Sequence, residues 1–123
     1  MKKILFLYLI IHCTLVIDNC LSQWQPDVRL TNDPASSFTC NNNAWCIASI
    51  GSVVHVVWQD DRDGNREIYY KRSTDAGVSW GTDTRLTNNS ASSFYPALSV
   101  SGQVLHVVWY DDRDGVTNNE IYY

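Results

Sequence analysis

The chain has 123 residues and a formal net charge of −4; 45% of its residues are hydrophobic, 12% aromatic and 18% charged. This composition excludes a disordered chain, and the length leaves room for one ordinary domain. The acidic balance argues against nucleic acid as a partner, because phosphate binding needs a basic surface. Many aromatic residues, with recurring clusters of Gly, Asn, Asp and Ser, favour β-structure with tight turns over a helical bundle.

Residues 1–22 have the pattern of a secretory signal peptide. Two N-terminal lysines precede an apolar run over 4–17, and the small residues Cys20 and Ser22 precede a cleavage site. The alternatives are an uncleaved membrane anchor, for which the run is short, and a lipoprotein modified at Cys20, whose preceding acidic and amide residues do not fit. We therefore expect a secreted, extracellular protein whose mature part is 23–123, with no membrane contact after cleavage.

The mature part contains an internal repeat. Five blocks recur in the same order, about 51–56 residues apart: WQPDVRLTN resembles WGTDTRLTN, and ASSF, HVVW, DDRDG and EIYY each occur twice. Chance does not produce such an ordered series. A period of this size is typical of proteins built from stacked structural units that share a core.

Each repeat unit predicts a series of antiparallel strands bounded by turn residues. The first unit, 46–88, contains four, at 47–50, 53–59, 66–72 and 78–86. The second unit, 96–123, contains three, at 97–100, 104–110 and 120–123. A lone strand at 24–32 precedes them. The strand at 53–59 is apolar on both side-chain rows, so we expect both of its faces to be covered.

Ser73, Asp75, Gly77 and Trp80 form an S-x-D-x-G-x-x-W motif, which suits a tight hairpin. Asp75 can accept hydrogen bonds from backbone amides of the turn, and Ser73 can hydrogen-bond across its mouth. Gly77 supplies a positive φ, and Trp80 covers the turn with its apolar ring.

This motif resembles the Asp-box (BNR) repeat of sialidases and related β-propellers, and the resemblance covers about 100 residues. It implies an all-β fold of antiparallel four-stranded blades, here one full blade and parts of two others in a partial propeller. It also implies that the motif is a structural turn on the face opposite the ligand site.

A second repeated polar cluster, DDRDG, joins the second and third strands of each unit, and the resemblance places it on the ligand face. One interpretation is a ring of carboxylates and guanidiniums that binds a sugar or a cation. The other is a structural turn, in which Asp caps backbone amides and Arg pairs with a neighbouring Asp; recurrence in both units favours it. Calcium is disfavoured because the spacing does not fit a calcium loop. The candidate ligand-face residues are Asp60, Asp61, Arg62, Asp63, Asp111, Asp112, Arg113 and Asp114.

Cys40 and Cys46 lie in an insertion that the second unit lacks. In an oxidising compartment they could form a disulfide, which would stabilise the fold by roughly 2 kcal/mol through loop closure. The alternative is two free thiols. A metal site is disfavoured, because only two sulfurs and no nearby His are present.

His55 and His106 occupy equivalent mid-strand positions, where a hydrogen-bonded core role is expected rather than a ligand role. The tyrosines of the two EIYY blocks are expected to pack between blades.

The resemblance to sialidases does not extend to catalysis. A sialidase needs three arginines that clamp the substrate carboxylate, an acid/base Asp and a Tyr–Glu nucleophile pair. The Arg-Ile-Pro motif of the first clamp does not occur in this sequence. We expect no catalytic residue, metal or cofactor in this chain.

The resemblance therefore implies a secreted, sialidase-like Asp-box module that binds glycans or other extracellular polymers or acts as a scaffold. The alternative is the N-terminal part of an exo-α-sialidase whose active-site residues lie outside this sequence. Two blades do not close a propeller. The expected partner is thus the rest of a longer propeller chain, or further copies of this chain in a homo-oligomer.

Overall fold

A computed structural model describes residues 26–123, and the expected signal peptide at 1–22 lies outside the described residues. The described chain is all-β apart from one short 3-10 helix, η1 (Asn43–Trp45), and no helix in it is long and apolar enough to span a membrane. The strands are β1 (Ser37–Phe38), β2 (Ile47–Ile50), β3 (Val53–Asp60), β4 (Glu67–Ser73), β5 (Thr84–Arg85), β6 (Ser93–Ser101), β7 (Val104–Asp111) and β8 (Glu120–Tyr122).

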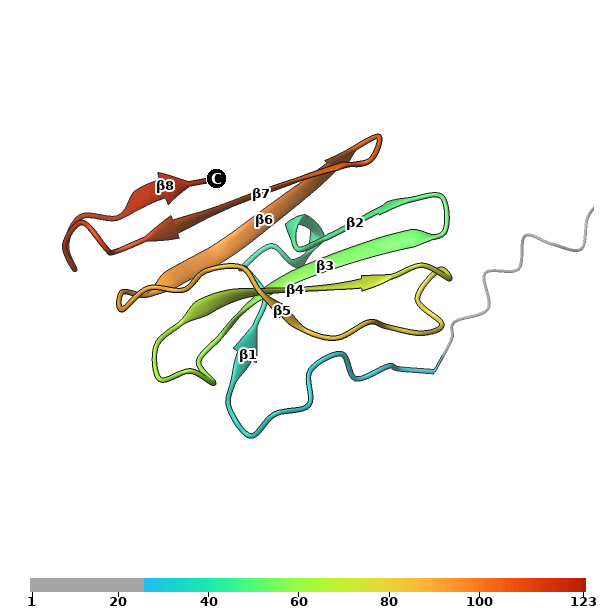
Figure 1. Ribbon diagram of the computed structural model, residues 1–123, viewed down its shortest axis with the longest axis horizontal. Coiled ribbons are helices and arrows are strands. Elements are labelled where there is room, and N and C mark those ends of the chain that lie inside the picture. Colours follow the sequence, from blue (N-terminus) through green and yellow to red (C-terminus); the bar gives the residue numbers. More distant parts are fainter. Residues whose placement is uncertain (1–25) are drawn as a thin grey trace, which may run out of the picture.

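The strands form two antiparallel sheets (Figure 1). In the first sheet β3 pairs with β4 along most of its length, and β5 pairs with the far side of β4. β2 and β1 share the other edge of β3, β2 along one half and β1 at its Gln59 and Asp60 end. The second sheet has the order β6-β7-β8. The strands expected at 47–50, 53–59, 66–72, 97–100, 104–110 and 120–123 all form, with small shifts at their ends.

The core lies between the two sheets, which stack with β6 over β3 (Figure 1). Val57 points into this layer and packs near Cys46 and Leu98. Successive side chains of a strand point to opposite faces, so Val56 and Trp58 lie on the other face of β3, in a second apolar cluster with Tyr69, Leu30 and Trp80. The expectation that this strand is covered on both faces is therefore confirmed.

The strand expected at 78–86 is wrong in extent, since only Thr84 and Arg85 pair with β4. The residues before them belong to the hairpin turn, where Gly81 N donates to the carbonyl of Arg72 at 2.9 Å. Beyond Gly81 the chain separates from β4 and rejoins it only at Tyr69 and Tyr70. The first part of the expected strand therefore belongs to the turn, and ladder pairing with β4 is confined to its end.

The lone strand expected at 24–32 is not formed over its described part, 26–32. No strand of residues 26–123 pairs with this segment through a backbone ladder. The segment is instead held against the outer face of the first sheet. Leu30 packs on the Trp58 cluster, and Lys71 Nζ donates to the Leu30 carbonyl.

The sequence did not predict the short strand β1 or the early start of β6. β6 begins at Ser93 and contains a register shift between Phe94 and Ala97, where Tyr95 has a φ of 47°. Pro96 has no N–H to donate, so an uninterrupted ladder cannot pass through it. The Cys40–Cys46 insertion separates β1 from β2 at the corresponding place in the first sheet.

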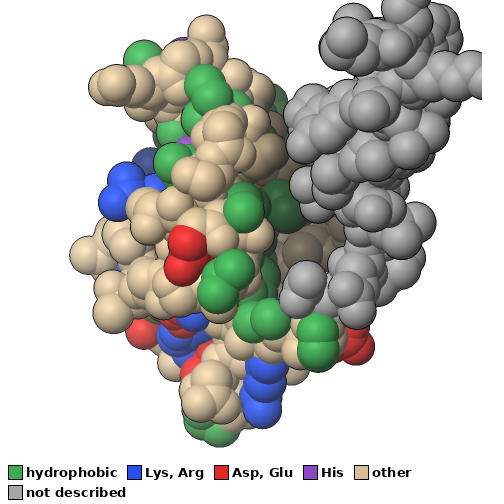
Figure 2. Space-filling view, turned by 90° about the vertical axis from the view of Figure 1, so that its right-hand side faces the viewer, with side chains coloured by type: hydrophobic (Ala, Val, Ile, Leu, Met, Phe, Trp, Pro, Cys, Tyr) green, Lys and Arg blue, Asp and Glu red, His purple; other side chains and the backbone are tan. Residues whose placement is uncertain are grey.

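The 73–80 turn and the DDRDG loop that follows β3 lie at opposite ends of the first sheet, because β4 runs from one to the other (Figure 1). Figure 2 faces the end that carries the 73–80 turn. On the visible part of this end, hydrophobic side chains are scattered among polar and backbone surface rather than gathered in one patch.

Candidate functional site

The DDRDG loop after β3, here called the first polar turn (Asp60, Asp61, Arg62, Asp63 and Gly64), is organised around the fully buried carboxylate of Asp60. Arg62 binds it through Nε at 2.9 Å and Nη2 at 2.7 Å, and Arg62 N donates to it at 3.1 Å. Two further side chains donate to this carboxylate. They are Ser37 Oγ of β1, at 2.7 Å, and Trp58 Nε1, two residues earlier in β3, at 3.0 Å. Five donors thus satisfy one buried carboxylate, which ties β1 to β3.

All three guanidinium nitrogens of Arg62 have acidic partners within the chain. The guanidinium pairs with Asp33 at 2.7 Å and with Asp83 at 2.8 Å, and its carbon lies 4.3 Å from the centroid of the Tyr69 ring. Asp83 is also bound by Lys71 Nζ at 2.7 Å. Arg62 therefore links the segment before β1, the chain before β5 and the face of β4.

These hydrogen bonds and ion pairs determine whether Asp60 and Arg62 are ionised. Burial by itself would raise the pKa of Asp60, but hydrogen bonds from Arg62, Ser37 and Trp58 outweigh it and hold the pKa well below its usual range. The hydrogen-bonded ion pair with Asp60 in turn raises the pKa of the Arg62 guanidinium. Both groups are therefore ionised at neutral pH, so Asp60 has no proton to exchange there.

The other members of the first polar turn also serve the fold. Asp61 Oδ1 accepts from Ser36 N at 3.0 Å, and Gly64, with a φ of 93°, donates to the Asp61 carbonyl at 3.2 Å. Asp63 accepts from the Tyr69 hydroxyl and pairs with an arginine of β5 at 3.1 Å. Burial and the bond to Asp63 raise the pKa of Tyr69 to about 12.

The second polar turn (Asp111, Asp112, Arg113, Asp114 and Gly115) makes corresponding contacts. Arg113 binds the buried Asp111 carboxylate through Nε at 2.9 Å and Nη2 at 2.7 Å, and lies 3.9 Å from the centroid of the ring of Tyr122. Asp112 Oδ1 accepts from a backbone amide of the preceding segment at 2.7 Å, and Asp114 accepts from the Tyr122 hydroxyl. The Arg113 hydrogen bonds lower the pKa of Asp111.

The eight candidate ligand-face residues thus divide into two internal clusters, one at the end of each sheet. Their carboxylates and guanidiniums contact the chain's own amides, hydroxyls and rings. This is the arrangement that the structural-turn interpretation predicts. Within residues 26–123, no three His, Cys, Asp or Glu side chains gather as a metal site.

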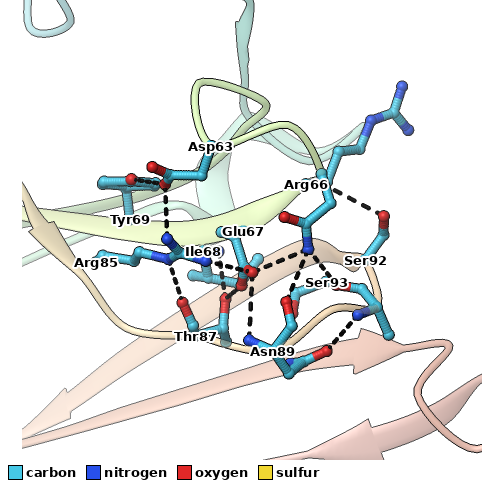
Figure 3. A network of polar contacts seen from close by, with 12 residues as sticks. Asp63, Arg66, Glu67, Ile68, Tyr69, Arg85, Thr87, Asn89, Ser92 and Ser93 are labelled. Carbon is cyan, nitrogen blue, oxygen red and sulfur yellow. Dashed lines mark hydrogen bonds and ion pairs between the residues drawn. The ribbon is translucent and has the colours of Figure 1, made fainter.

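A network centred on Glu67 was missed by the sequence analysis (Figure 3). The Glu67 side chain is fully buried, and Arg85 Nη2 binds it at 2.6 Å. Asn65 Nδ2 donates to it at 2.9 Å, and the Thr87 hydroxyl donates to its second oxygen. The Thr87 hydroxyl accepts from Ile68 N at 2.8 Å. The sequence does contain a signal for this network, because Glu, Arg and Thr recur at fixed places in the EIYY and RLTN blocks.

The 73–80 turn has the hydrogen bonds expected of its motif. Gly77, with a φ of 89°, donates to Ser73 Oγ at 2.8 Å. Asp75 Oδ1 accepts from Ser79 N at 2.8 Å, and Asp75 Oδ2 accepts from Ser79 Oγ at 2.6 Å. Trp80 folds back so that its Nε1 donates to the Gly77 carbonyl at 3.0 Å. Within the turn, all four motif residues make the local contacts that the motif predicts.

Asp75 provides a direct test of this turn. Hydrogen bonds from the side chain and backbone of Ser79, then from Ser73, lower the pKa of Asp75 to about 2. We expect a carboxyl titration followed by NMR to give this value, and Ser79→Ala to move it back towards the ordinary value near 4. Because the folded pKa is depressed, the carboxylate stabilises the fold above the unfolded pKa, and this contribution disappears as the pH falls through the folded pKa. An ordinary Asp75 pKa in the unsubstituted chain would contradict the turn geometry.

Cys40 and Cys46 are buried free thiols in the structure, with their sulfur atoms 2.9 Å apart. Cys46 Sγ also lies 3.3 Å from the Pro96 carbonyl, which ties the insertion to β6. The two residues are thus adjacent as expected, and the disulfide between them stays a prediction.

The reactivity of the Cys46 thiol tests whether this residue is buried as the structure describes. Burial, together with the bond to Cys40, raises the pKa of the Cys46 thiol to about 12. Since the thiolate is the nucleophile, iodoacetamide should alkylate Cys46 much more slowly in the folded, reduced chain than in urea, as measured by peptide mass spectrometry. Equal rates in the two conditions would show that the site is open.

His55 is buried and its Nδ1 lies 2.8 Å from the Tyr70 hydroxyl, while His106 makes the same contact with Tyr123. Burial lowers the pKa of His55. Both histidines are hydrogen-bonded as expected, but only His55 lies in the core, since His106 is half-buried.

A hollow of about 480 Å³ opens where the chain before β5 separates from β4. An aromatic ring (Trp80), a phenol (Tyr70) and an exposed guanidinium (Arg72) meet there. The remaining lining residues are Thr74, Ser79, Gly81, Thr82 and Thr84. This set combines apolar ring faces with several hydroxyl donors and acceptors.

Comparisons with protein-family models, curated proteins and solved structures found no match.

Proposed function

We propose that the chain is part of a secreted, sialidase-like Asp-box β-propeller and acts as a scaffold or glycan-binding module. The observation that carries the proposal is the use of both polar turns within the fold: Asp60 with Arg62, and Asp111 with Arg113. The stacking of two antiparallel sheets and the hydrogen bonds of the 73–80 turn also support it.

The same observation argues against a catalytic acid or base within the two polar turns of this chain. A glycosidase needs two carboxyl groups that face the scissile bond, one of which gives up or takes a proton. The buried carboxylates of Asp60 and Asp111 face guanidinium groups of their own turns, and their pKa values are held low. They therefore fit neither the acid nor the base role in this chain.

The hollow beside Trp80 has side chains that suit a glycan, and it lies at the end of the sheet opposite to the one where the resemblance to sialidases places a ligand. Sugars present an apolar ring face that packs on an aromatic side chain, and hydroxyl groups that pair with hydroxyls and guanidinium groups. Trp80, Tyr70 and Arg72 offer these chemistries within one concave surface, with threonine hydroxyls around them.

A glycan array probed with the full chain, with sialylated and neutral oligosaccharides, tests this function. We expect binding that Arg72→Ala removes and Arg66→Ala leaves intact. Arg66 is the matched control because it lies at the other end of β4, beside the rings of Phe38 and Phe94. Absence of binding by the folded chain would remove the glycan-binding function. Release of the fluorophore from a fluorogenic sialoside would favour the sialidase alternative.

A further inference from the structure

The segment between β5 and β6 contains a sequence feature that neither the turns nor the hollow use. Residues 88–90 read Asn-Asn-Ser, the one Asn-x-Ser/Thr triplet in the sequence. In chains that pass through a secretory compartment, such a triplet accepts N-linked oligosaccharide when its middle residue is not proline and its asparagine lies at the surface. The middle residue is Asn89, so the first condition is met. The place of the triplet in the fold determines the second.

The fold presents Asn88 to solvent. Thr87 before it is buried and donates its hydroxyl to Glu67. Asn89 after it is half-buried, and its carbonyl accepts from Asn65 Nδ2 at 3.0 Å. The two neighbours thus hold the backbone against the start of β4, while Asn88 itself is exposed. An exposed side chain in an irregular segment can carry a bulky group without displacing a buried one.

The first repeat unit shows that the turn does not need the serine of the triplet. The corresponding residues there are Asn32, Asp33 and Pro34. Asp33 Oδ1 accepts from the amide two residues later at 2.9 Å, and Asn89 Oδ1 accepts from the amide two residues later at 2.8 Å. The two turns share this hydrogen bond although one has proline and the other has Ser90. Ser90 therefore completes the triplet without being required by the turn.

Asn88 lies at the end of the first sheet that carries the first polar turn. Its segment is bonded to β4 near the beginning of that strand, since Leu86 N donates to the Ile68 carbonyl at 2.7 Å. The segment is flanked by described strands on both sides, β5 and β6. The hollow lies where the other end of β4 meets the 73–80 turn. A group attached to Asn88 is therefore at the opposite end of the sheet from the hollow.

We propose that Asn88 is an acceptor site for N-linked oligosaccharide, which an oligosaccharyltransferase transfers from a polyprenyl diphosphate donor. The bond between C1 of the first sugar and the phosphate oxygen breaks, and the diphosphate leaves with its electron pair. C1 bonds to Nδ2 of Asn88, and that nitrogen loses one proton. The inference rests on the secretory route of the proposed function and does not require the module itself to bind glycans.

Translation of the full chain in the presence of endoplasmic-reticulum microsomes tests the site. We expect a species of lower gel mobility that is protected from added protease. Peptide N-glycosidase should return it to the mobility of the unmodified chain. Because this enzyme converts the acceptor asparagine to aspartate, mass spectrometry of the released peptide should show that mass change at Asn88.

Substitutions within the triplet separate its chemistry from the loop that carries it. Asn88→Gln and Ser90→Pro should each abolish the modified species, and Ser90→Pro keeps the turn because Pro34 occupies that place in the first unit. Ser90→Thr preserves the hydroxyl and should keep the modification. Because Asn88 is exposed, the modified parent and Asn88→Gln, both purified from a eukaryotic secretory host, should unfold at the same urea concentration.

The outcomes separate this inference from the proposed function. A chain that enters the microsomes but stays unmodified overturns the acceptor site and leaves the secretory route intact. A chain that stays accessible to protease and unmodified contradicts the secretory route, and the site with it. Modification that persists in Asn88→Gln places the sugar elsewhere and also overturns the proposal. So does a modified chain that fails to fold, since Asn88 would then not be a surface position that tolerates the sugar.

Discussion

Replacement of Asp60 by Asn is expected to lower the free energy of unfolding by about 3 kcal/mol, at the lower end of the range for breaking a buried ion pair. Arg62, Trp58 Nε1 and Ser37 Oγ all donate to this fully buried carboxylate. An amide would bring two hydrogens into a site that contains only donors. Arg62 is 20% exposed, which lets water replace part of the loss. Urea unfolding followed by tryptophan fluorescence measures the change.

Asp61→Asn is the matched control in the same turn. Asp61 uses one oxygen to accept from Ser36 N, and an amide oxygen can take that role. We expect a loss below about 1 kcal/mol, as for an ordinary hydrogen bond. Equal losses for the two variants would contradict the central position of Asp60.

The effect at Asp60 should also depend on pH. The Asp60 pKa is lowered in the folded state, so its contribution is complete above the unfolded pKa near 4 and is lost as the pH falls through the folded pKa. The difference between Asp60→Asn and the unsubstituted chain should therefore be full at neutral pH and shrink in acid. A difference that grows in acid would mean that the carboxylate is not ionised in the fold.

The second large effect is expected at Glu67, where Glu67→Gln should cost about 2–3 kcal/mol, the range for hydrogen bonds to a charged group. The buried carboxylate is bound by Arg85 and by the side chains of Asn65 and Thr87 (Figure 3). The substitution removes the charge that balances Arg85 and places amide hydrogens against donors. Thermal or urea unfolding gives the loss directly.

The repeat supplies the control for Glu67. Glu120 occupies the same place in the second EIYY block but is exposed. Glu120→Gln should change stability by less than about 0.5 kcal/mol, as surface substitutions do. Comparable losses at the two positions would show that the network around Glu67 is not what stabilises this edge.

Much of the fold could be predicted because its signals are local. Short β-rich runs between turn residues located β2, β3 and β4, and the S-x-D-x-G-x-x-W motif predicted the backbone hydrogen bonds of Asp75 and the positive φ of Gly77. The repeat then transferred each assignment to the second sheet. Turn chemistry is also why β5 was overestimated: the ladder resumes only at Thr84, after the turn has used the preceding residues.

The candidate site was predicted less completely, because its contacts join distant segments. Pairing of Arg62 with Asp60 follows from their spacing, but its contacts with Asp33 and Asp83 depend on how three segments meet. In the sequence Glu67 looks like an ordinary strand residue, and its burial depends on the ion pair with Arg85, which comes from another segment. Pattern alone does not reveal which charged residues a fold buries together.

A double-mutant cycle between Asp60 and Arg62 tests the central claim, that the repeated polar turns support the fold rather than bind a ligand. Asp60→Asn, Arg62→Gln and the double variant would be unfolded in urea alongside the parent chain. We predict a coupling energy of about 2–3 kcal/mol, within the range for residues of one buried network. Losses that add to within about 0.5 kcal/mol would mean that the two groups act independently, and would contradict the account.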